Sequence, residues 1–566
     1  MKTQFQILVV IALVLSTLNP QPSTVFAQGS LTPPGAPAPT MKTLAQIEPR
    51  TPISSLPFTI TNSGSYYLTT NLIGTGGANR GITILADHVT LDLNGFVLTG
   101  PGGSSGSANE SGIYVGTPAQ DITVQNGSVS QWKGNGVDTS TAGNSQLKNL
   151  LAVNNGANGL NGGVGSVTDC QARFNSADGI SGATASLIRG CTAALNASRG
   201  IVTGNGATVN SCTAFANGNG GIITADSCTV VSCSAYGNTF SGIFTGNACT
   251  VKDSSASANG SSGFYCGNGC TISSCSVQGS SATGITAGDG CVVKDCTSKD
   301  NAGMFSSGIA AGANCSVQGC TASGNAYIGI LTGTNATVNG CVASGNSSIG
   351  IFASSGATVN GCTAAGNSNV GIELGGSATV SGCMANQNTR DGISVAGGVA
   401  MSGCSANGNS GNGIVTGGQA LVEQCQSSYN SRTGIVAATQ CRISRCVVEG
   451  NRADGIFGLN ENVLVGNNCA LNGSAAGGAS GAGIHLTSFG NRIEDNQVAR
   501  NDRGIQLDQT GNLVMKNSAR SNGTNYSLVA GNNVGVIVIP PASGAISGST
   551  GGAGVGSTDP WANFSY

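Results

Sequence analysis

The sequence predicts an all-β protein: a single-stranded right-handed parallel β-helix, a solenoid of about 20 coils, mostly of 21 residues each. Three observations favour it. A Gly followed by an aliphatic residue recurs every 21 residues, apolar and polar positions alternate within each repeat, and the remaining positions are rich in Gly, Thr, Ser and Asn, which are poor helix formers. Length alone would suggest several globular domains, but stacked repeats bury one continuous core instead.

The repeat runs from Gly81-Ile82 to Gly504-Ile505, and its consensus turn is G-I-x-x-G-x-x-A-T-V-x-G-C-T-A-x-x-N-x-x-x. The constant Ile, Val, Cys and Ala are expected to point inward, and the short alternating stretches indicate three short strands in each turn. A helical solenoid would need an amphipathic stripe, and a leucine-rich repeat would need L-x-x-L-x-L, so neither fits. Equivalent strands of neighbouring coils should then lie parallel, about 4.8 Å apart, with right-handed crossovers.

An Asn follows the Cys column by five residues in most turns, as at Asn175, Asn196 and Asn217. Asn tolerates left-handed backbone, and its amide can hydrogen-bond to its copy in the next coil. We therefore expect a ladder of Asn residues in the left-handed region at one turn of the solenoid.

The opening segment FTITNSGSYYLTTNL, followed by GITILADHVTLDLNGFVLTG, resembles the entry segment of bacterial secreted right-handed parallel β-helix repeat proteins of the pectate-lyase-like superfamily. The resemblance covers roughly residues 58–539. It implies the β-helix fold but no particular activity, because this superfamily includes lyases, hydrolases, epimerases and adhesins.

The first 27 residues are typical of a secretory signal, with Lys2, an apolar run at 7–18 and small residues at 25–27 before the expected cleavage site. The alternative, a membrane anchor, needs a longer apolar run, so we expect no transmembrane segment after signal removal. The mature chain should be secreted, periplasmic or on the cell surface. The expected organisation is a signal peptide at 1–27, a Pro/Ala-rich linker at 28–50, the β-helix with an N-terminal cap segment at 51–540, and a Gly/Ser-rich C-terminal tail at 541–566.

The 21 cysteines fall at inward positions of the repeat. In-register Cys side chains would have parallel Cβ directions, which suit the disulfide torsion badly, so we interpret them as buried unpaired thiols. Some disulfides and a metal array are the alternatives. Six cysteines precede the main column by five residues, and Cys266 takes a Thr position. The expected main column is Cys170, Cys191, Cys212, Cys233, Cys275, Cys296, Cys320, Cys341, Cys362, Cys383, Cys404, Cys425, Cys446 and Cys469.

The superfamily resemblance implies that an enzyme would carry acidic residues, Asp-bound Ca²⁺ with an Arg base, or a G-H-G motif on one sheet. No G-H-G occurs, and residues 301–372 contain no Asp, Glu, Lys, Arg or His. Charge gathers toward the C-terminal coils, where the weak catalytic candidates are His485, Asp502 and Arg503. The alternative, which we favour, is a salt-bridged end cap like the stacked Asp178 and Arg199.

Metal, cofactor and nucleic-acid sites are not expected. The two His residues, His88 and His485, lie far apart in coil order, so they cannot form a ligand cluster. A chain of this length with 22 Lys and Arg and a net charge of −2 offers no phosphate-tracking patch.

The residue after each inward aliphatic should face solvent, and this column is unusually apolar. Exposed aromatic faces can pack on sugar rings, so Phe244, Tyr265, Phe352 and Phe457 are the candidate ligand-binding residues. Strand propensity alone, or cover from the N-terminal arm or C-terminal tail, would also explain the column.

These observations favour a secreted, non-catalytic β-helix rod that acts as an extracellular binding or surface-structural protein. The expected partner is a polysaccharide or a cell-surface component, and the oligomeric state stays open. The alternative is a polysaccharide lyase or glycoside hydrolase with its site on the C-terminal coils.

Overall fold

The computed structural model describes residues 47–75, 80–102, 110–477, 480–539 and 559–566. The chain divides into two compact units, Met1–Pro49 and Arg50–Tyr566, and the second unit carries the elements considered below. The expected signal peptide, linker residues 28–46 and tail residues 541–558 lie outside the described residues.

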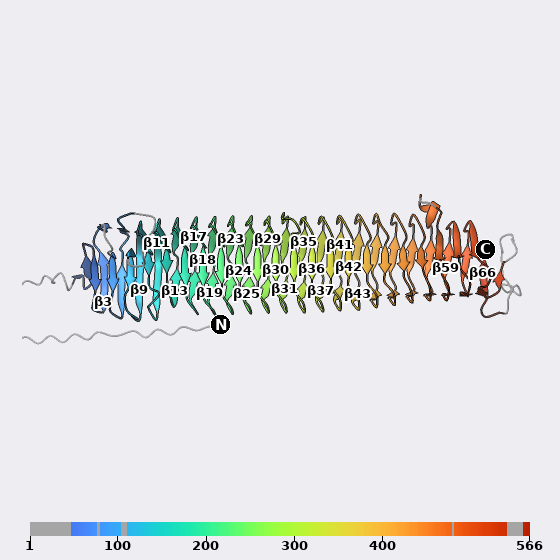
Figure 1. Cartoon of the computed structure of the whole chain (residues 1–566), viewed down its shortest axis with the longest axis horizontal. Helices are drawn as coiled ribbons and strands as arrows, with labels where there is room; N and C mark the ends of the chain where they lie inside the picture. The colour runs from blue at the N-terminus through green and yellow to red at the C-terminus, as the bar shows by residue number, and fades with distance from the viewer. Residues whose placement is uncertain (1–46, 76–79, 103–109, 478–479, 540–558) are drawn as a thin grey trace, which may run out of the picture. The chain divides into compact units, whose positions relative to one another are not determined.

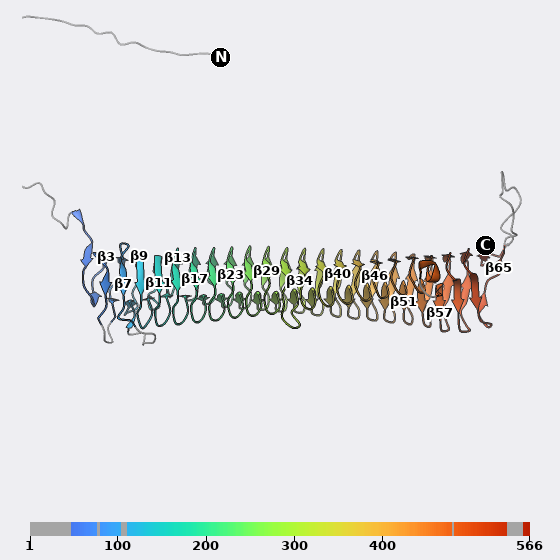
Figure 2. The same cartoon turned by 90° about the horizontal axis from the view of Figure 1, so that it is seen from above.

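Most coils of the unit Arg50–Tyr566 contain three short strands, and in two N-terminal coils the second and third strands are continuous, as β9 (Ile122–Ser130) and β11 (Ser145–Val153). A representative coil contains β15 (Ile180–Gly182), β16 (Leu187–Arg189) and β17 (Thr192–Ala194). Each pairs in parallel with its copy in the next coil, so that Ile180 of β15 lies opposite Ile201 of β18 (Ile201–Thr203). Figures 1 and 2 show these copies stacked in register along the unit. The right-handed parallel β-helix predicted from the sequence is therefore confirmed.

The strands equivalent to β15 form one sheet, called sheet B here, with 22 parallel members from β2 (Phe58–Ile60) to β63 (Thr524–Leu528). The repeat pattern predicts 20 of these turns. The two additional turns cap the ends, where Phe58 and Tyr526 replace the Gly-aliphatic signal: Phe58 pairs with Ile82, and Tyr526 pairs with Ile505. The other two strands of each coil together form sheet A.

The strands are short because each coil bends at three residues in the left-handed region. In the representative coil these are Ala185, Gly190 and Leu195, all with φ near +60°. The residue after each bend, respectively Ser186, Cys191 and Asn196, is buried. One repeated corner geometry thus turns a Ser, a Cys and an Asn into the interior of the same coil.

The predicted inward columns fill the core. In one coil Ile201, Val209, Cys212 and Ala214 are each at most 1% exposed. The same columns continue through the neighbouring coils as one hydrophobic cluster. Because every position repeats at the spacing of the coils, each side chain packs against its own copies above and below.

The Asn ladder forms, but its backbone conformation differs from the expectation. The left-handed residues are those directly before the ladder, such as Phe174 before Asn175 and Leu195 before Asn196, and the ladder Asn residues are not among the residues with positive φ. Bending at the preceding residue directs the amide inward. Asn175 Nδ2 donates to Asn196 Oδ1 (2.9 Å) and to the Ala152 carbonyl (3.2 Å), so the buried amide keeps its hydrogen bonds.

All 21 cysteines are free and buried. The cysteines at the corners link neighbouring coils through hydrogen bonds to the backbone, as the ladder Asn residues do. The Cys228 N–H donates to Cys249 Sγ (3.2 Å), and the Cys249 thiol donates to the Ala225 carbonyl (3.2 Å). One placement is wrong: Cys469 pairs with Val448, in the column expected to hold Ala, because Asn467 already occupies the corner above Cys446.

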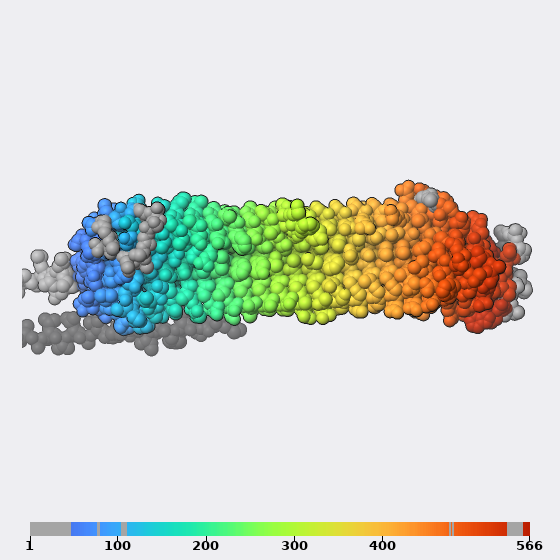
Figure 3. All heavy atoms as spheres, viewed as in Figure 1, coloured from blue at the N-terminus to red at the C-terminus, as the bar shows by residue number. Residues whose placement is uncertain are grey.

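Both ends of the unit are closed by irregular pairings. At the N-terminal end β1 (Thr51–Ile53) pairs with β3 (Gly64–Leu68). At the other end β66 (Asn563–Ser565) pairs with both β62 (Ser518–Arg520) and β65 (Ile537–Val538), so the last described residues return to sheet A. A 3₁₀ helix, η2 (Gly473–Ala476), lies in an insertion that projects from the C-terminal coils (Figures 1 and 3).

Candidate functional site

The outward column of sheet B carries a pair of stacked aromatic rings. Phe244 lies on β24 (Ile243–Thr245) and Tyr265 opposite it on β27 (Phe264–Cys266). Their ring centroids are 5.0 Å apart and their planes differ by 2°, and Tyr265 is 43% exposed. The faces of the two rings therefore cover each other, and a ligand cannot lie flat across both.

One face of this stack remains open. The next residues in the same column are Thr286 and Ala310, which are paired in register with Tyr265 and with each other. Their side chains are too short to cover a ring, so within this column of the described residues no large side chain stands against the face of Tyr265 that is turned away from Phe244. Phe244 supports Tyr265 from behind.

The other two aromatic candidates lie apart from this pair. Phe352, on β39 (Ile351–Ala353), stands between Leu331 and Glu373 in the column. Phe457, on β54 (Ile456–Gly458), packs edge-to-face on His485, with centroids 5.4 Å apart. The four predicted aromatics thus occupy three separate places on the outer face of sheet B.

His485 lies at the centre of an ion cluster on the C-terminal coils. It belongs to β57 (Ala482–Leu486) and lies opposite Gln506 of β60 (Arg503–Leu507), as the coil register predicts. Its Nδ1 is 3.0 Å from an Asp454 carboxylate oxygen, and its Nε2 is 2.9 Å from an Asp508 carboxylate oxygen. Both ring nitrogens are therefore engaged by acids.

The electrostatics favour a charged imidazolium. Burial works to lower the pKa of His485, but the hydrogen bonds with Asp454 and Asp508 outweigh it, so the pKa lies above its ordinary value. Burial also works to raise the pKa of Asp508, but His485 and Gln506 hold it below its ordinary value. A general base needs a free nitrogen, whereas both nitrogens of His485 are engaged. A carboxyl that acts as general acid needs a raised pKa, whereas the pKa of Asp508 is lowered.

Arg503 joins this cluster, whereas Asp502 does not. Arg503 Nη1 donates to Gln506 Oε1 (2.9 Å), and Gln506 Nε2 donates to Asp508 Oδ1 (2.9 Å). Asp502 instead accepts the backbone N–H groups of Ser474 and Gly481, at 2.9 and 2.7 Å, and the Ser474 hydroxyl. The Asp502 carboxylate holds the η2 insertion in place through these hydrogen bonds. His485, Asp502 and Arg503, the predicted catalytic candidates, therefore do not form one site.

A second aromatic stack was missed from the sequence. Phe215 and Tyr236 lie on the sheet A strands β20 (Thr213–Phe215) and β23 (Ser234–Tyr236), with centroids 4.9 Å apart and planes 3° apart. The signal was present, because these two residues are separated by one 21-residue period. The predicted Asp178–Arg199 contact is present, with 2.7 Å between Arg199 Nη2 and Asp178 Oδ2.

Within the described part of the chain, no group of three or more His, Cys, Asp or Glu side chains is arranged to hold a metal ion. Over the same residues, no helix has both the length and the apolar character that crossing a membrane requires.

The two sheets of stacked strands, the inward ladders and the buried corner Asn column define a right-handed parallel β-helix solenoid. The family model described as "Right handed beta helix region" matches the chain in overlapping segments that together span residues 103–539. The chain therefore belongs to the right-handed β-helix family.

Comparison with curated proteins gives no match. Among solved structures, the chain is similar to pectate lyase Pel9A, at 14% identity over 40% of this chain and 68% of that chain, with a TM-score of 0.27. It is also similar to the periplasmic alginate epimerase AlgG, at 12% identity over 61% of this chain and 73% of that chain, with a TM-score of 0.23. A third similarity is to the N-terminal fragment of bacteriophage Phi29 gene product 12, at 12% identity over 82% of this chain and 86% of that chain, with a TM-score of 0.26. These similarities concern the fold and carry no information on activity.

Proposed function

We propose that the protein is an exported, non-catalytic binding solenoid whose ligand is a carbohydrate on a polysaccharide or at a cell surface. The observation that carries the proposal is the exposed Tyr265 ring, which is backed by Phe244 on one face and followed in its column by the short side chains of Thr286 and Ala310 on the other. A sugar ring presents apolar C–H faces and hydroxyl edges. It would pack flat on the Tyr265 ring, while the Thr286 hydroxyl supplies a hydrogen-bonding group beside it.

Export is part of this proposal and rests on the sequence. The charged start at Lys2, the apolar run 7–18 and the small residues at 25–27 support a cleaved signal peptide at 1–27, followed by a linker at 28–50. Amino-terminal sequencing of the exported protein tests it, and we expect Gln28 as the first residue. A chain exported with Met1 intact would contradict the cleavage.

The experiment for ligand binding is a glycan array on the exported chain, followed by calorimetric titration of each hit. Tyr265→Ala should weaken binding by more than about tenfold, because it removes the stacking face. Phe244→Leu should have a smaller effect, since an aliphatic side chain can still support the Tyr265 ring. Tyr236→Ala is the matched control: it removes a Tyr of nearly identical stacking geometry from sheet A and should leave binding unchanged.

The second candidate function is a polysaccharide lyase or glycoside hydrolase acting at the C-terminal coils. The observation in its favour is that Asp454, His485, Asp508 and Phe457 lie together on the outer face of sheet B. A reducing-end assay on the array hits separates the two functions. Turnover that His485→Ala and Asp508→Ala abolish would establish the enzyme, whereas binding without turnover, lost in Tyr265→Ala, would establish the binder.

A further inference from the structure

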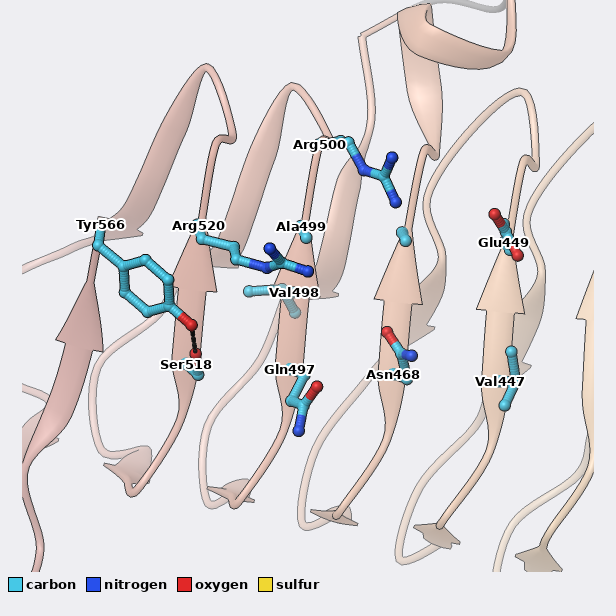
Figure 4. A pocket seen from close by; sticks show the side chains of 11 residues that line it. Val447, Glu449, Asn468, Gln497, Val498, Ala499, Arg500, Ser518, Arg520 and Tyr566 are labelled. Carbon is cyan, nitrogen blue, oxygen red and sulfur yellow. Dashed lines mark hydrogen bonds between the residues drawn. The ribbon is translucent and has the colours of Figure 1, made fainter. Parts of the chain in front are cut away.

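A polar groove lies on the outer face of sheet A near the C-terminal end of the solenoid (Figure 4). It has a volume of about 170 Å³ and crosses β53 (Val447–Glu449), β56 (Asn468–Ala470), β59 (Gln497–Ala499) and β62 (Ser518–Arg520). Two outward columns of the coil register form its floor. One column reads Val447, Asn468, Gln497 and Ser518, and the other reads Glu449, Ala470, Ala499 and Arg520.

The groove exists because two consecutive positions of the second column are Ala. Ala470 and Ala499 leave a depression between the longer side chains of Glu449 and Arg520. Tyr566 borders the far end, with its hydroxyl 3.2 Å from Ser518 Oγ (Figure 4). The groove is separate from the Phe244–Tyr265 stack and from the His485 cluster, which both belong to sheet B.

Two guanidinium groups line this groove without a partner among the residues that the structure describes. Arg500 and Arg520 belong to neighbouring coils, and the Arg500 N–H donates to the Arg520 carbonyl (3.2 Å). Neither side chain forms an ion pair or hydrogen bond among the described residues. Two other arginines on these coils are paired: Arg445 lies 3.3 Å from Glu423, and Arg492 lies 2.6 Å from Glu494. The acid in the groove, Glu449, lies three coils from Arg520, roughly 14 Å at the usual strand spacing.

We propose that this groove binds the tetrahedral oxyanion of a phosphate or sulfate ester carried on a sugar or a similar polyol. Two guanidinium forks one coil apart can share the oxygens of such a group, whereas one fork already satisfies a planar carboxylate. The amides of Asn468 and Gln497 lie along the floor, where they can bond to hydroxyl groups. Glu449 can accept hydrogen bonds from hydroxyl groups at the other end and repels a second anionic group.

This inference goes beyond the proposed function, because it names a different face, different residues and a charged ligand. Calorimetric titration of the full chain with glucose 6-phosphate, glucose 6-sulfate, glucuronate and glucose tests it. We expect an ester to bind more tightly than glucuronate, and glucose not to bind. Added salt should weaken the binding, since exposed charges are screened. The ester that binds more tightly identifies the natural source of the oxyanion.

Arg500→Gln and Arg520→Gln should each weaken ester binding by about tenfold or more, because each removes charge-assisted hydrogen bonds. The matched control is Arg445→Gln, which changes the same residue type on a nearby coil outside the groove and should have no effect. Tyr265→Ala should also leave ester binding unchanged, so failure of this site and failure of the proposed function are distinguishable. The inference is overturned if neither ester binds, if glucuronate or glucose binds as tightly as the esters, or if both groove variants retain wild-type affinity.

Discussion

Removing one amide from the buried Asn ladder should destabilise several coils at once. Asn367→Ala removes the Oδ1 atom, which accepts hydrogen bonds from the Asn346 backbone N–H (3.1 Å) and from Asn346 Nδ2 (3.0 Å). The Nδ2 atom that donates to the Ala343 carbonyl (3.1 Å) and to Asn388 Oδ1 (3.0 Å) is lost as well. Asn367 is fully buried, so water cannot replace these bonds. The Asn346 backbone N–H and the Ala343 carbonyl then lack a partner, at a cost of about 1–3 kcal/mol each, so the free energy of unfolding should fall by roughly 2–6 kcal/mol.

Two companion variants separate the ladder from a generic loss of an amide. Asn360→Ala removes an exposed Asn of the same coil, and its cost should stay within about 1 kcal/mol. Asn367→Cys should recover about 1 kcal/mol or more of the loss, because a thiol at the equivalent corners accepts the same N–H and donates to the same kind of carbonyl.

The assay combines urea unfolding with hydrogen exchange. The Asn346 amide should exchange faster in Asn367→Ala, and protection should fall first in the adjacent coils, because coils contact mainly their neighbours. Equal stability of Asn367→Ala and Asn360→Ala, together with an unchanged exchange rate at Asn346, would refute the ladder as a stabilising element.

Three further outcomes are expected. Ile351→Ala should cost roughly 2–5 kcal/mol in urea unfolding, because Ile351 is fully buried in the middle of its ladder, and an unchanged midpoint would show that the register is wrong. Most thiols should react with a thiol reagent after denaturation without reductant. In the folded chain they should resist modification, because they are buried and burial raises the pKa of Cys266 to about 12. A sample in which most cysteines are oxidised would overturn the ladder of unpaired thiols. The folded-state pKa of His485 is raised, so its contribution to stability should be complete below the ordinary pKa near 6.5 and fade as the pH rises through the folded-state value. The stability difference between wild type and His485→Gln, measured across that range, should therefore shrink with increasing pH, and a difference that grows would contradict the ion cluster.

The columns could be predicted because a strict period places every copy in line. The inward Ile, Cys and Asn ladders and the His485–Gln506 pairing all follow from counting 21 residues. The period does not show which residue of a corner bends: the prediction of a left-handed φ at Asn196 is wrong, because Leu195 directly before it has that conformation. Asn and Cys can occupy the same corner position of the coil. Asn467 occupies the position above Cys446, so Cys469 lies two residues further along, in the column of Val448, and its predicted place in the Cys column is wrong.

The site was less accessible to sequence reasoning, because it depends on side-chain orientation and on insertions. The coil spacing brings Phe244 and Tyr265 close enough to stack on each other, so the two ring faces that meet are not available to a ligand, which the column alone does not show. Asp502 binds the η2 insertion, and an insertion has no periodic counterpart from which its position could be read. The unpaired state of Arg500 and Arg520 likewise becomes evident only when the positions of all nearby acids are known.

The most direct test of the proposed function is a crystal structure of the protein with the tightest glycan from the array. We predict a sugar ring packed flat on the face of Tyr265 that is turned away from Phe244, above Thr286 and Ala310, with its glycosidic bonds intact. A glycan seated instead across His485 and Asp508, with a glycosidic bond cleaved beside the carboxylates, would contradict the account.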